Sequence, residues 1–212
     1  MNGLVTNNFY SMQDNIKLSL LIALPISVVP LLIGDPGMIA MIIAIQTFIF
    51  ASNTGTSLKM DESSKWNRFE ITLPVTRYSI INAKYISFLM LIMMGVVVSL
   101  VTVALQRLRG ELSAELLFTG YSFGLQLALT TIAIVYPLIL KIGAEKSDTL
   151  LFVAAGLAVG LRFLIWYLLY LSDDTINFKS TIVDQISLGL AIVMFVLSYG
   201  VSVMIYRKKE FN

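Results

Sequence analysis

Cysteine and histidine are both absent from the 212 residues of this chain. Without cysteine there is no disulfide framework, thiol nucleophile or cysteine-bound metal. Without histidine, the commonest general base and the commonest metal ligand are missing. The chain also lacks a Gly-x-x-x-x-Gly-Lys-Ser/Thr segment, so it has no phosphate-binding loop of its own. We therefore expect no cofactor, no metal site and no enzymatic activity on this chain; if ATP is used, another chain binds it.

Charged residues are also scarce, at 13% of the chain against about 25% in an average soluble domain. The hydrophobic fraction is 57% and the mean hydropathy is +0.83, which together indicate an integral membrane protein. Six apolar runs predict an all-α fold of six transmembrane helices in a single domain covering residues 1–212. We place the spans at about 18–33, 38–57, 85–105, 116–140, 149–171 and 183–206.

The residues before the first span carry a helical stripe of apolar side chains. Val5, Phe9, Met12 and Ile16 are spaced four, three and four apart among polar residues. This pattern predicts an N-terminal amphipathic helix that lies in the membrane interface. The alternative is that these residues are simply the start of a long first helix.

The longest strongly polar stretch is Lys59–Lys84, between the second and third spans. Asp61 is placed to cap a short helix that carries Trp66 and Phe69 on one face, and Thr76 is placed to begin the next helix. We predict a polar helix across the membrane surface, which a motor or partner domain could push on. The alternative is a solvated loop whose aromatic rings rest on lipid headgroups.

The distribution of positive charge predicts the orientation. With the N-terminus inside, eleven Lys and Arg residues fall on the cytoplasmic side and three on the outer side. The eleven are Lys17, Lys59, Lys65, Arg68, Arg77, Lys84, Lys141, Lys146, Arg207, Lys208 and Lys209; the three are Arg107, Arg109 and Lys179. Because cytoplasmic loops are enriched in positive charge, both termini are expected in the cytoplasm of a multi-pass cell-membrane protein.

A few polar residues inside the predicted spans are candidates for a substrate pathway. Arg162 is a full charge deep in the fifth span, where it would contact substrate carboxylates or a counter-charge in a central cavity. Its alternative role is structural, by pairing with Asp184 or by reaching the outer interface. Gln46, Asn53 and Gln126 also lie in spans, where they would line a pathway or form hydrogen bonds between helices.

Two segments carry a resemblance to a known family. RFEITLPVTRYSIINAKYI and YPLILKIGAEKSD are similar to the cytoplasmic segments of type-2 ABC exporter permeases. The first has the pattern of a leucine-proline pair, a small residue and an arginine, followed by alanine-lysine-tyrosine at the next span. The matching positions are Leu73, Pro74, Thr76, Arg77, Ala83, Lys84 and Tyr85, and then Tyr136, Pro137, Lys141, Gly143, Glu145 and Lys146.

The resemblance implies the membrane subunit of an ATP-driven exporter. Such permeases work as dimers of identical or similar chains, with two cytoplasmic ATPase subunits that bind ATP and Mg. The resemblance implies that the residues coupling this chain to the ATPase are Glu62, Lys65, Trp66, Arg68, Phe69, Glu70, Arg77, Lys141, Glu145 and Lys146. The chain resembles the small permeases of Gram-positive bacteria that export amphipathic or antimicrobial peptides, so the resemblance implies a peptide substrate and no nucleic acid.

Two other functions compete with this one. A substrate-binding membrane subunit of a vitamin importer also has about six spans, but it would have short cytoplasmic loops, which the segment 59–84 argues against. A membrane enzyme without histidine or cysteine would need paired carboxylates or a serine-lysine pair.

Overall fold

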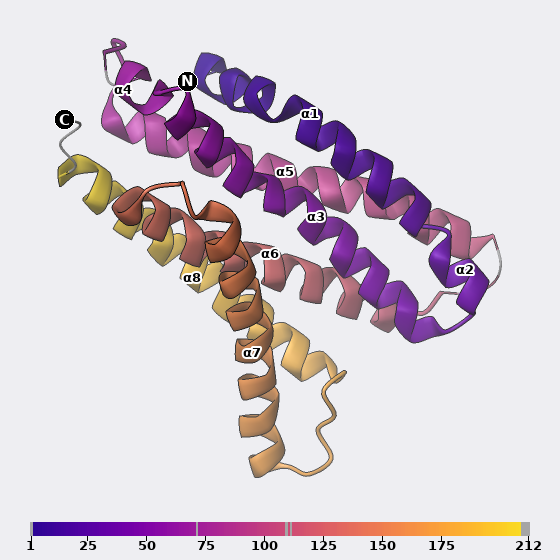
Figure 1. Ribbon diagram of the computed structural model, residues 1–212. Helices are drawn as coiled ribbons and strands as arrows, with labels where there is room; N and C mark the ends of the chain where they lie inside the picture. Colours follow the sequence, from indigo (N-terminus) through magenta and orange to yellow (C-terminus); the bar gives the residue numbers. More distant parts are fainter. Residues whose placement is uncertain (1, 71, 109, 111, 209–212) are drawn as a thin grey trace.

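The computed structural model describes residues 2–70, 72–108, 110 and 112–208. Over that part of the chain it consists of helices joined by turns and loops, with no β-strand (Figure 1). Six of them are long and apolar enough to cross a membrane, which confirms the predicted all-α fold of six spans. The helices are α1 (Asn2–Ile26), α2 (Val29–Ile33), α3 (Pro36–Ser63), α4 (Trp66–Glu70), α5 (Arg77–Arg107), α6 (Ala114–Ile142), α7 (Ser147–Ser172) and α8 (Thr181–Lys208).

The long helices form two groups that diverge toward one end of the molecule. One group is built around α3, and the other consists of α7 and α8. Helix α3 packs against α1, α5 and α6, while α6 also contacts α7 and α8. Figure 1 shows α7 and the first half of α8 leaning away from the other helices. The start of α1, the end of α8 and the short helix α4 all lie at the other end, which we call the α4 end.

Short polar side chains fix where several spans begin. The Asp35 carboxylate accepts a hydrogen bond from the Gly37 amide at 2.8 Å, and Thr76 Oγ1 accepts one from the Ser79 amide at 3.2 Å. Ser113 does the same for α6. Each cap satisfies an amide that has no partner within its own helix. The predicted start of a helix at Thr76 is confirmed.

The N-terminal stripe does not form a separate interfacial helix. It is the first half of α1, which continues without a break to Ile26, so the prediction of an independent helix is wrong. Met12 and Ile16 are buried and pack with Phe50 and Leu91. The apolar stripe was read correctly, but it faces α3 and α5 instead of lipid headgroups.

Glycines allow α5 and α6 to approach α3 very closely. A Cβ atom on Gly95 would lie 2.8 Å from Thr47 Cα, and one on Gly124 would lie 2.9 Å from Ala44 Cα. Small residues of this kind let the backbones of membrane helices come into contact. Helices α3, α5 and α6 therefore form a tightly packed part of the molecule.

Candidate functional site

The two polar segments that resemble permease motifs are joined at the α4 end. The Glu62 carboxylate accepts a hydrogen bond from the Ala144 amide, and Lys59 Nζ lies 3.0 Å from Asp148 Oδ2. One partner of each pair comes from the last turns of α3 and the other from the connection between α6 and α7 or the first turn of α7. Segments about eighty residues apart in sequence are therefore in contact at the α4 end.

Several of the predicted coupling residues lie at this end of the molecule with their side chains exposed. Phe69 on α4 is 55% exposed, although it is a large apolar side chain. Lys65, which separates α3 from α4, has a left-handed backbone with φ of 57° and is exposed. The side chains of Lys141, Glu145 and Lys146 are exposed as well. We call these five residues the α4-end surface.

Other predicted coupling residues contact other parts of this chain. Glu70 is buried and accepts a hydrogen bond from the Tyr206 hydroxyl at 3.0 Å, so its prediction as an ATPase contact is corrected. Arg77 Nη1 donates to the carbonyl oxygens of Tyr206 and Arg207, at the end of α8. Trp66 is half-buried and packs against the core. The side chain of Arg68 lies outside the described part of the chain.

A buried ion pair, which the sequence analysis did not predict, lies at the same end of the molecule as the α4-end surface. Asp61, predicted as a helix cap, lies inside α3 and pairs with Lys84 of α5, with side chains 3% and 5% exposed. Lys84 Nζ also donates to Asn8 Oδ1 at 2.6 Å, and Asn8 Nδ2 donates to Ser87 Oγ at 2.9 Å. The pair thus ties α1, α3 and α5 together. Lys84 lies two turns into α5, whose start at Thr76 was predicted, but its pairing with Asp61 was not.

The charge of Lys84 also acts on the carboxyl at the end of α4. Burial raises the pKa of the Glu70 carboxyl above its ordinary value. The Lys84 ammonium and the hydrogen bond from Tyr206 oppose this rise, while the nearby Asp61 adds to it. The end of α4 is therefore anchored to α8 by a carboxyl whose protonation depends on the cluster around it.

At the opposite end, Arg162 forms the structural pair with Asp184 that was the alternative to a substrate contact. The Arg162 side chain is 2% exposed and its Nη2 donates to Asp184 Oδ1. Thr119 Oγ1 donates to the other carboxylate oxygen at 2.7 Å. The guanidinium carbon lies 4.9 Å from the Phe123 ring centre and 5.1 Å from that of Phe178.

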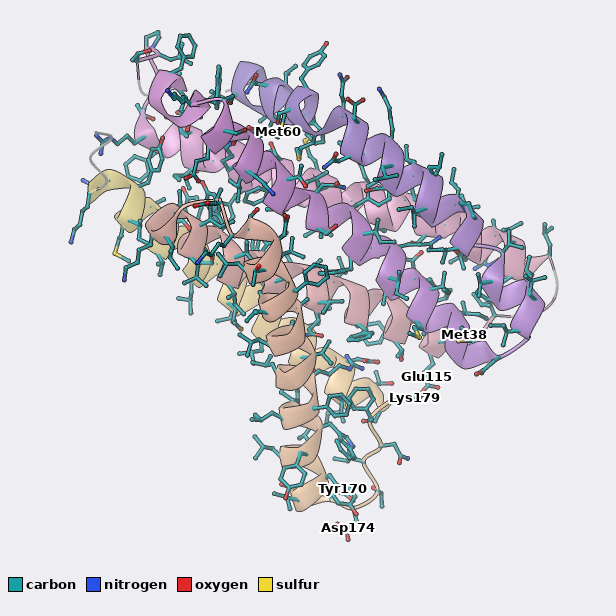
Figure 2. All side chains as sticks on the ribbon, in the orientation of Figure 1. Met38, Met60, Glu115, Tyr170, Asp174 and Lys179 are labelled. Atoms are coloured by element: carbon teal, nitrogen blue, oxygen red, sulfur yellow. The ribbon has the colours of Figure 1, made fainter. Side chains whose placement is uncertain are left out.

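Arg162 also borders a cleft of about 610 Å³ between the two diverging groups of helices. Its other walls come from the first turns of α3 and α6 and from the connection before α8, and they are mostly apolar. Figure 2 shows Glu115 and Lys179 next to one another below Met38, and all three residues line this cleft. We call it the Arg162 cleft.

The other polar residues predicted for a substrate pathway are bonded between helices. Gln46 Nε2 donates to Ala23 O at 2.9 Å, and its Oε1 accepts from Thr102 at 2.8 Å. Asn53 donates to Ser19 Oγ at 2.9 Å, and Gln126 donates to the carbonyl of residue 158 at 2.9 Å. The three side chains are buried and do not line the Arg162 cleft. Their observed role is to join α3 to α1 and α5 and to join α6 to α7.

Comparison with known proteins agrees with the family resemblance of the segments around Pro74 and Gly143. A sequence model described as ABC-2 family transporter protein matches residues 3–207. The chain belongs to this family. It is therefore a permease subunit of an ABC transporter, embedded in the membrane by several spans and working with an ATPase partner. No curated protein and no solved structure matches the chain.

Proposed function

We propose that this permease moves amphipathic or antimicrobial peptides out of the cell or its membrane, driven by ATP hydrolysis on a separate subunit. The observation that carries the coupling part of the proposal is the joining of the two motif-bearing segments by Glu62–Ala144 and Lys59–Asp148. One surface formed by both segments suits a single ATPase partner. The excess of Lys and Arg assigned to this side supports placing the α4 end in the cytoplasm.

The internal bonds suggest how movement of α4 would spread through the permease. An ATPase that engages Phe69 would displace α4, whose last residue, Glu70, is bonded to Tyr206 of α8. The neighbouring Asp61–Lys84 pair would pass the displacement to α3 and α5. Residues 72–76 between α4 and α5 are not helical, so transmission runs through these side-chain bonds. Such movement would shift the bundle between two packings.

The proposed assembly contains two permease chains and two ATPase subunits, with ATP and Mg bound by the latter. Support for this composition and for a peptide substrate is the resemblance of the segments around Pro74 and Gly143 to peptide-exporting permeases. Export is proposed on the same basis. The long polar segment 59–84, with its half-exposed α4, is unlike the short cytoplasmic loops expected of a vitamin-importer subunit.

Purification from native cells tests this function. The tagged permease, extracted in a gentle detergent, should carry a stoichiometric ATPase subunit that mass spectrometry identifies. Replacing Phe69 by Ala should reduce the retained ATPase or uncouple its hydrolysis from peptide efflux. Phe118→Ala is the matched control, because Phe118 is 38% exposed on the first turns of α6 at the opposite end. Normal association and normal efflux in Phe69→Ala would rule out this contact.

A further inference from the structure

Two hydrogen-bond donors of Arg162 remain unused. Asp184 takes only Nη2, and its second oxygen is occupied by Thr119. Within the described part of the chain, Arg162 Nε and Nη1 are buried and have no hydrogen-bond partner. Buried charged donors without an acceptor are costly, and an oxygen ligand from outside the protein would satisfy this edge of the guanidinium.

The surroundings of Arg162 restrict what this ligand is. The residue borders the cleft, and the rings of Phe123 and Phe178 hold the guanidinium plane in place. Lys179 supplies a second cation in the cleft lining, and it forms no ion pair within the described residues. Arginine presents its donors in a planar fork that suits phosphate and carboxylate oxygens.

Two acidic side chains, Asp35 and Glu115, also belong to the lining of the cleft. The Asp35 carboxylate is already bonded to the amide of Gly37, where it caps α3. Glu115 lies in the first turn of α6 and is exposed. Near a helix start such carboxylates are partly balanced by the helix dipole. Arg162 and Lys179 are the two groups in the lining that can donate charge-assisted hydrogen bonds to an anionic ligand.

We propose that the Arg162 cleft binds the phosphate of a phospholipid from the leaflet at the end opposite α4. Phosphate oxygens would accept from Arg162 Nε and Nη1 and from Lys179 Nζ, while the acyl chains would follow the apolar walls. The cleft lies level with the first turns of α3, α6 and α8, where spans end and headgroups lie. The lipid would fill the angle between the diverging groups of helices. This inference does not depend on which substrate the transporter carries.

Native mass spectrometry of the purified permease, in detergent doped with phosphatidylglycerol, tests the proposal. Wild-type protein should retain one lipid per chain that survives conditions removing all other adducts. Lys179→Gln should lower the fraction carrying that lipid by about tenfold, the loss expected for one charge-assisted hydrogen bond. Lys17→Gln is the matched control, because Lys17 is an exposed lysine on α1, away from the cleft.

A second variant keeps the test valid if altering Arg162 alone prevents folding. Arg162→Gln combined with Asp184→Asn removes both buried charges, so no uncompensated charge is left, and it should abolish the retained lipid while the protein stays monodisperse. Equal lipid retention by wild type and both cleft variants would overturn the proposal. So would displacement of the lipid by an amphipathic peptide with a free C-terminal carboxylate but not by its amide, since the cleft would then be a substrate site.

Discussion

Loss of the Lys84 ammonium should destabilise the permease strongly. In Lys84→Met the Asp61 carboxylate, 3% exposed, would be left buried without its counter-charge. Removing one partner of a buried pair costs about 3–5 kcal/mol. Asn8 would also lose its donor, worth about 0.6 kcal/mol between membrane helices. For a chain of this size the total corresponds to a fall in Tm of about 7–22 °C.

Thermal unfolding of the purified permease measures this effect, for example as loss of the monodisperse peak in size-exclusion chromatography after heating. The control is Lys59→Met, because the Lys59–Asp148 pair is 50% and 63% exposed. Exposed pairs contribute only about 0–1 kcal/mol. The double variant Asp61→Leu/Lys84→Met should recover most of the lost stability, because replacing both members of a buried pair by apolar residues is often neutral or stabilising.

The outcome that would refute this reasoning is a Lys84→Met variant that unfolds at the same temperature as Lys59→Met. Water would then reach the Asp61 carboxylate, and the Asp61–Lys84 pair could not couple movements of α3 to those of α5. A double variant no more stable than Lys84→Met would show instead that the loss comes from packing of the lysine stem.

Three further predictions concern packing, the α4-end surface and pH. Gly95→Ala places a methyl group against the α3 backbone and should cost about 1–3 kcal/mol in thermal unfolding, whereas Gly156→Ala, with nothing within 4 Å, should be neutral or stabilising. Phe69→Ala should weaken ATPase association and change Tm little, because the side chain is 55% exposed. Trp66→Ala should lower the unfolding free energy by about 1–2 kcal/mol, because this half-buried ring packs against the core. Equal Tm values for the two variants would contradict this division. The raised pKa of Glu70 means that the folded state keeps its proton where the unfolded chain releases it, so stability falls as pH rises from the ordinary value of 4.5 through the folded-state pKa. Glu70→Gln should remove this fall, and parallel Tm-against-pH curves for wild type and variant would contradict the assignment.

Sequence patterns were sufficient wherever a residue acts through its own helix or through bulk lipid. The six spans follow from the length and hydropathy of each apolar run, and the start of α5 at Thr76 follows from the capping chemistry of a threonine. The grouping of the α4-end residues also has a local signal, since the two polar segments that carry them fall on the same predicted side of the membrane.

Pairing between helices could not be read from the chain. Nothing local distinguishes Asp61 as a helix cap from Asp61 as the partner of Lys84, twenty-three residues away, because the choice depends on which faces of α3 and α5 meet. The same holds for the stripe around Met12, which would suit either lipid or protein until its neighbour is known. Charge, hydropathy and capping are properties of single segments, so the sequence alone predicts them. The burial of Glu70 and the lack of a partner for Arg162 Nε and Nη1 within the described residues depend on how separate helices pack, which only the tertiary structure decides.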